Sequence, residues 1–118
     1  MTLFDKYGGR AFWSDTVDIF YGRLLEDPTM ASYFRNYDVA KVQAMNTYVL
    51  ESTLGFTNEH FAVGVKKVHT NVIVHRPDFH RYLEILLEVL REKGMEEEDL
   101  GEVHELLRNY EGDVVKHE

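Results

Sequence analysis

The segment VKKVHTN, residues 65–71, is the stretch on which the interpretation of this chain depends. Its His69 stands where the apolar face of a helix would carry an aliphatic side chain, and the residues after it do not continue the helical pattern. Far upstream, Tyr21 and Asn46 each interrupt an apolar stripe with a hydrogen-bonding group. One imidazole and two polar side chains directed into an apolar interior suggest a buried cofactor whose metal is held from one side only.

Length and composition limit the classes of protein that need to be considered. A chain of 118 residues predicts one domain over residues 1–118, with a core but no room for a second domain. The formal net charge of −8 argues against nucleic acid or an anionic membrane as a partner, because phosphates would be repelled. The absence of cysteine excludes disulfides, thiolate-bound clusters and covalent cofactor attachment through a C-x-x-C-H motif. With neither a signal-like nor a membrane-spanning run, we expect a soluble cytoplasmic protein.

Apolar residues recur with helical spacing along most of the chain, and no strand-like alternation is visible, so we predict an all-α fold. Glycines, prolines and capping residues set the expected boundaries: Gly8-Gly9 ends a first short helix, Ser14 caps the second, and Asp38 caps the third. The predicted helices cover residues 3–7, 14–26, 38–54, 57–71 (weakly), 76–93 and 96–114.

Two apolar stripes contain the polar residues of interest. The stripe of the second helix and that of the third are both expected to face the core. They comprise Val17, Phe20, Tyr21, Leu24 and Leu25 in the second helix, and Val42, Met45, Asn46, Val49, Leu50 and Leu54 in the third.

His69 has two interpretations. A single histidine on an apolar face is usually a core residue bonded to a carbonyl. The alternative is a metal ligand, since a neutral imidazole nitrogen is a natural axial ligand to haem iron. The neighbours favour this alternative: Val65 and Val68 offer apolar surface to a porphyrin, and Lys66 and Lys67 reach toward carboxylates at its edge.

Tyr21 and Asn46 also allow two interpretations. Tyr21 is either a core tyrosine bonded to a backbone carbonyl or a donor to a ligand. The Asn46 amide costs roughly 1–3 kcal/mol if it is buried without a partner. It therefore either makes a helix-to-helix hydrogen bond or faces Tyr21 across a small pocket, where both side chains share one polar ligand atom.

Several short motifs succeed one another in a linked order. They are Gly8-Gly9, Asp18-Ile19-Phe20-Tyr21, Leu25-Glu26-Asp27-Pro28, Tyr33-Phe34, Leu54-Gly55, Lys67-Val68-His69 and Asp78-Phe79. In this order and spacing, from Leu3 to about Val115, the chain resembles a truncated haemoglobin, most similar to the group I members.

The resemblance implies an edited globin fold, a two-over-two helical sandwich around haem b (iron protoporphyrin IX). It implies one role for each matched position. His69 is the proximal iron ligand, Phe34 wedges against the porphyrin, and Tyr21 is the distal hydrogen-bond donor. Val42 and Asn46 are distal positions on the facing helix with Met45 between them, and Phe79 is a proximal aromatic residue.

The chain departs from the family pattern at several of these positions. Gly55-Phe56 replaces the usual glycine pair, Asn46 stands where glutamine is more usual, and Val42 gives no hydrogen bond. Tyr21 must therefore supply most of the distal hydrogen bonding. Met45 stands where some relatives carry a histidine as sixth ligand, and we expect it to pack on the porphyrin edge.

The leading functional hypothesis is reversible binding of dioxygen, with carbon monoxide and nitric oxide as further ligands, at a five-coordinate ferrous haem b for oxygen binding, transport or storage. One alternative is a nitric oxide dioxygenase, which needs an external reductase because the chain has no flavin or nicotinamide motif. Others are a redox or sensor haem that is six-coordinate through Met45 or Tyr21, and a cofactor-free acidic interaction module.

Overall fold

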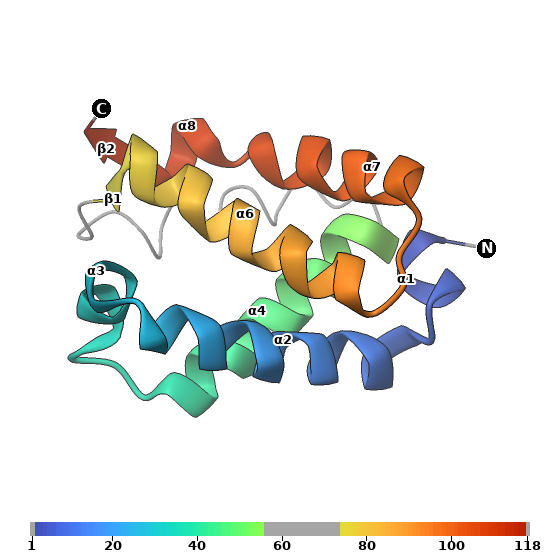
Figure 1. Ribbon diagram of the computed structural model, residues 1–118, viewed down its shortest axis with the longest axis horizontal. Helices are drawn as coiled ribbons and strands as arrows, with labels where there is room; N and C mark the ends of the chain where they lie inside the picture. Colours follow the sequence, from blue (N-terminus) through green and yellow to red (C-terminus); the bar gives the residue numbers. More distant parts are fainter. Residues whose placement is uncertain (1, 56–73, 118) are drawn as a thin grey trace.

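The computed structural model describes residues 2–55 and 74–117, and this part of the chain is mostly helical (Figure 1). The all-α prediction is confirmed. The elements in chain order are α1 (Leu3–Lys6), α2 (Gly9–Glu26), α3 (Pro28–Ala31), the 3-10 helix η1 (Ser32–Phe34), α4 (Val39–Gly55), β1 (Val74–His75), α6 (Arg76–Glu92), α7 (Glu97–Arg108), α8 (Glu111–Val114) and β2 (Val115–His117).

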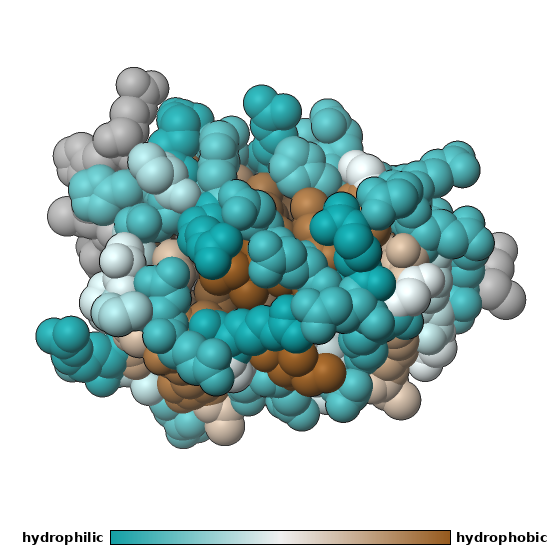
Figure 2. All heavy atoms as spheres, viewed as in Figure 1, coloured by the Kyte–Doolittle hydropathy of each residue, from teal (hydrophilic) through white to brown (hydrophobic). Residues whose placement is uncertain are grey.

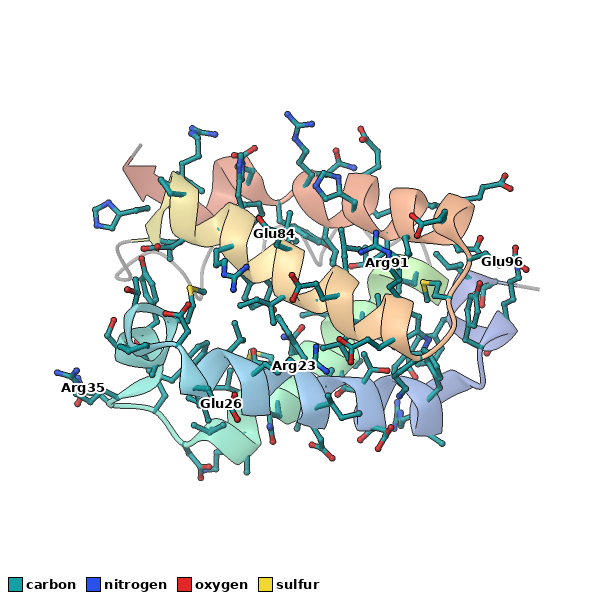
Figure 3. All side chains as sticks on the ribbon, viewed as in Figure 1. Arg23, Glu26, Arg35, Glu84, Arg91 and Glu96 are labelled. Atoms are coloured by element: carbon teal, nitrogen blue, oxygen red, sulfur yellow. The ribbon has the colours of Figure 1, made fainter. Side chains whose placement is uncertain are left out.

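Four long helices form two pairs. Helix α2 packs on α4, and α6 packs on α7, while α2 also contacts α6 and α4 contacts α7 (Figure 1). This arrangement is the expected two-over-two sandwich. In Figure 2, charged and polar side chains cover most of this face, and apolar surface is visible in several smaller patches, one of them in the strip between α2 and α6. Arg23 of α2 spans the same strip and pairs with Glu92 of α6 at 2.5 Å (Figure 3).

The start of α2 differs from the prediction. The helix begins at Gly9 rather than after Ser14, because Gly8 and Gly9 adopt φ angles of 124° and 64° and turn the chain directly into it. The early start places Trp13 in the core, where its Nε1 donates to the Phe4 carbonyl at 3.0 Å. Ser14 is therefore an exposed residue inside the helix rather than its cap.

The end of α2 agrees with the prediction, but its apolar stripe is narrower. The helix ends at Glu26, and Asp27 then caps α3 by accepting from the Thr29 amide at 3.0 Å. Leu24 is fully buried, whereas Leu25 is 41% exposed. At about 100° per residue, Leu25 lies well off the line through Val17 on which Leu24 lies.

Among the other helix boundaries, two were predicted correctly from neighbouring residues and one was not. The Asp38 carboxylate accepts from the Ala40 amide at 3.1 Å, and Pro77 lies in the first turn of α6, both as predicted. The last predicted helix is instead divided into α7 and α8. Glu111 of α8 accepts from Arg76 at 2.6 Å and contacts His80 at 2.8 Å. These contacts hold α8 against α6.

Two short strands were not anticipated. Strand β1 pairs in parallel with β2, with Val74 opposite Val115. A pairing of two or three residues is too short to leave an alternating pattern in the sequence.

Asp99 joins the start of α7 to α1. It is buried, and its Oδ2 accepts from Lys6 Nζ at 2.8 Å and from the Tyr7 hydroxyl. The hydrogen bond from Lys6 and then the one from Tyr7 hold the pKa of the Asp99 carboxyl below its usual value. Ionised Asp99 therefore stabilises the fold at neutral pH, and this contribution is lost as the pH falls through the lowered pKa.

Replacing Asp99 with asparagine is expected to lower the free energy of unfolding at pH 7. The difference from wild type should narrow as the pH falls below about 4, where the wild-type carboxyl gains its proton. Urea unfolding between pH 7 and pH 3 measures this. The exposed Glu98→Gln in the same helical turn is the control, and a constant difference across the range would contradict the role of the charge.

Candidate cofactor and ligand site

A cavity of about 490 Å³ lies between η1, α4 and α6. Its volume is in the range of cofactor and ligand sites, and most of its walls are apolar. The six predicted site residues that the structure describes all line it. They are Tyr21, Phe34, Val42, Met45, Asn46 and Phe79.

Aromatic side chains form much of the wall. Phe34, from η1, meets the Tyr21 ring edge-on, with ring centroids 5.4 Å apart. Phe79, in the first turn of α6, is buried in the core and also faces the cavity. Such walls suit a flat aromatic ligand, because rings pack well against its faces and edges.

A polar cluster interrupts this apolar wall. Asn46 of α4 donates through Nδ2 to the Tyr21 hydroxyl of α2 at 2.8 Å and to the Tyr82 hydroxyl of α6 at 2.6 Å. The helix-to-helix hydrogen bond considered for Asn46 is therefore present, and the three side chains also border the cavity. We call Tyr21, Asn46 and Tyr82 the polar cluster.

Both phenols of the polar cluster are neutral donors at physiological pH. Burial raises the pKa of Tyr21, although the hydrogen bond from Asn46 and then the neighbouring Tyr82 hydroxyl lower it in part. Burial, followed by the neighbouring Tyr21 hydroxyl, raises the pKa of Tyr82 well above its usual value. Each phenol therefore keeps its proton and can donate it.

The stripe of α4 does not face the core along its whole length. Leu50 and Leu54 are buried as predicted, but Val42 and Val49 are half-buried and Met45 is 51% exposed. The reason is that this half of α4 faces the cavity, which polypeptide alone does not fill. Met45 stands at the cavity border, so its predicted burial in the core is wrong.

Tyr82 is a site residue that sequence analysis missed. It lies three residues after Phe79 and directly before Leu83, so helical spacing places it beside the apolar face of α6. That spacing is the signal that could have found it. Its hydroxyl partner on α4 is 36 positions away, which no local pattern reveals.

Five predicted site residues lie outside the described residues. They are Val65, Lys66, Lys67, Val68 and His69. Their roles stay predictions. The described walls fit a haem on two counts, namely a cavity of suitable size with aromatic and aliphatic sides, and a cluster of hydroxyl groups at one place on it.

In the part of the chain that the structure describes, helices packed two over two enclose an apolar cavity. A family model described as bacterial-like globin matches residues 2–116. The chain therefore belongs to the bacterial-like globins and, within them, to the truncated haemoglobin family.

Individual relatives agree with this assignment. The chain is 29% identical over 106 residues to a group 1 truncated hemoglobin of Synechocystis, covering 86% of each chain. Its fold matches the truncated hemoglobin of Tetrahymena pyriformis in its Fe(III) form with a TM-score of 0.86 at 23% identity, over 98% of both chains. It also matches the 2/2 hemoglobin of Synechococcus in the cyanomet state with covalently attached heme, with a TM-score of 0.83 at 23% identity, over 99% of this chain and all of that one.

Membership of this family makes the chain a haem-binding globin, and globins bind small diatomic gases. Among the described helices, none combines the length and apolar character needed to cross a membrane.

Proposed function

We propose that this protein binds dioxygen reversibly at a haem b in the cavity. Bound haem b supplies an iron whose open coordination position takes up a diatomic gas. The observation that carries the proposal is the polar cluster, which sets phenolic donors against an otherwise apolar wall. Neutral hydroxyl groups favour a ligand that accepts hydrogen bonds over one that does not.

Each predicted side chain has a specific part in holding the haem. His69 would hold the iron through its imidazole, and Lys66 and Lys67 beside it in the sequence would pair with the carboxylates of the haem. Phe34 and Phe79 pack on the ring system from η1 and α6.

Aliphatic side chains complete the pocket. Val65 and Val68 lie beside the axial ligand in the sequence, and Val42 and Met45 cover the porphyrin from α4. These apolar walls would keep water away from the iron and so slow its oxidation.

Within the polar cluster, Tyr21 is the donor to the ligand and Asn46 holds that donor in place. A carboxamide has two N–H groups, and in Asn46 both are directed to phenol oxygens. Asn46 therefore holds Tyr21 in place and has no N–H left for the gas. The O–H of Tyr21 is the group that would donate a hydrogen bond to the gas.

Absorption spectra of the ferric, ferrous and oxygenated protein test the cofactor and its coordination together. We expect a five-coordinate ferrous spectrum that changes on addition of oxygen and returns when oxygen is removed. A low-spin, six-coordinate ferrous spectrum without added gas would favour the redox or sensor alternative through Met45 or Tyr21. A protein that takes up no hemin would overturn the proposal.

Replacing Tyr21 with phenylalanine is expected to speed dioxygen release while hardly changing carbon monoxide release. The lost hydrogen bond contributes about 0.5–1.5 kcal/mol, which corresponds to an increase of up to roughly tenfold in the release rate. Stopped-flow or flash-photolysis rates for both gases measure this. Tyr48→Phe is the matched control, because Tyr48 is 55% exposed on α4 and does not border the cavity. Equal acceleration of both gases would count against a hydrogen-bonding role.

A further inference from the structure

Tyr82 occupies a place in the pocket to which the proposed function assigns no role. Its ring packs edge-on against Phe20 of α2, with centroids 4.8 Å apart, and the residue is one of those that line the cavity. The ring is thus fixed between α6 and α2, while the hydroxyl accepts from Asn46 at 2.6 Å. This rigid support makes the position of the hydroxyl well defined.

The hydrogen bonds of the polar cluster determine which proton remains available. The Tyr21 oxygen accepts from one N–H of Asn46 at 2.8 Å. The Tyr82 oxygen accepts from the other N–H at 2.6 Å, so Tyr82 fixes the carboxamide that donates to Tyr21. Tyr21 thus accepts from Asn46 and keeps its own proton to donate.

The surroundings leave one direction for that proton. Among the described residues, no backbone carbonyl or carboxylate accepts from the Tyr21 hydroxyl. The side chain of Tyr21 borders the cavity. We therefore infer that its O–H is directed toward the cavity, where donation from Asn46 to its oxygen polarises the O–H and makes it a stronger donor.

We propose that Tyr82 is a positioning residue for gas binding: through the polar cluster it directs and strengthens the Tyr21 O–H that bonds the ligand. Tyr82 acts through Tyr21 and does not itself contact the gas. This inference rests on the proposed function, and it predicts a specific dependence between the two tyrosines.

The test is a double-mutant cycle in the haem-loaded protein, which compares wild type, Tyr82→Phe, Tyr21→Phe and the double variant. Tyr82→Phe keeps the ring on Phe20 and removes only the hydroxyl. We expect about two- to fivefold faster dioxygen release, with carbon monoxide release unchanged. Because Tyr82 acts through Tyr21, the double variant should release dioxygen at the rate of Tyr21→Phe within about twofold.

A second measurement separates positioning from a purely structural role. The C–O stretching band of the carbonmonoxy form reports the polarity that the protein presents to the ligand. Tyr82→Phe should move this band to higher wavenumber, in the same direction as Tyr21→Phe, while Tyr48→Phe leaves it in place. Urea unfolding of each variant establishes that the fold is retained at the temperature of the experiment.

Three results would overturn the inference. The first is a Tyr82→Phe variant with unchanged dioxygen release. The second is faster release without movement of the C–O band, which indicates a structural effect alone. The third is independent, multiplying effects of the two substitutions, which indicates that Tyr82 contacts the gas directly. If Tyr21→Phe itself changes neither release nor the band, the proposed function has failed rather than the positioning role of Tyr82.

Discussion

Replacing His69 with alanine is expected to abolish stable haem binding, the largest single effect predicted for this protein. The described histidines support the choice of residue. His75 and His80 are exposed, His104 is half-buried, and none of these three borders the cavity. If the axial ligand is an imidazole, it comes from the part of the chain whose side chains are not described, where His69 alone stands in the predicted motif.

The measurement is hemin titration of the purified variant, together with its absorption spectrum. We expect the sharp bands of the bound cofactor to be lost or replaced by those of loosely held hemin. His60→Ala is the matched control, since it removes an imidazole nine positions away on the same stretch of sequence, and it should leave the bands intact. Added free imidazole should restore part of the wild-type spectrum in His69→Ala by taking the vacant axial position. Unchanged uptake and spectrum would disprove the assignment of His69.

The sequence was most informative where a boundary depends on one residue and its immediate neighbours. Proline at position 77 and the side-chain cap at Asp38 act within one helical turn, so α4 and α6 begin where predicted. Ser14 has the same capping chemistry but does not begin a helix. There the glycine turn before α2 and the burial of Trp13 outweigh the local preference.

The end of the chain shows the same limit. The apolar positions from Val103 to Val114 keep one helical pattern, yet the chain divides there into α7 and α8. The cause is a set of contacts between Glu111 and α6, formed by residues more than 30 positions apart in the sequence. Contacts over such separations do not change the periodicity and cannot be derived from it.

The candidate site could be predicted only in outline, because its contacts also join residues that are far apart in the sequence. Polar residues in apolar stripes, such as Tyr21 and Asn46, are visible one helix at a time. Their arrangement depends on how three helices cross. Only the structure shows that Asn46 directs both N–H groups to phenols, and that Tyr82 is the second of them. The spacing of Tyr82 in the sequence is that of an ordinary tyrosine beside an apolar helix face. Only its hydrogen bond with Asn46 identifies it as a site residue.

Removing the haem is expected to lower stability substantially, and most of all in the first half of α4. Val42, Met45 and Val49 lie along the cavity and are not fully buried by the polypeptide. In the proposed site, bound haem would cover these side chains and so add apolar burial to that of the polypeptide. A ligand that binds only the folded state, at a free concentration 1,000 times its Kd, stabilises that state by about 4.1 kcal/mol.

Thermal unfolding and amide hydrogen exchange of the protein with and without haem measure this effect. We expect a lower Tm without haem, and the largest loss of exchange protection in residues 39–49 rather than in residues 83–90 of α6, where most side chains are buried in the core. His69→Ala with added hemin is the control, because it keeps the cavity walls of η1, α4 and α6 while removing the proposed axial bond, and it should behave like the haem-free protein. An equal loss of exchange protection over both segments would mean that haem supports the fold as a whole. An unchanged Tm would mean that the cavity is not where the cofactor binds.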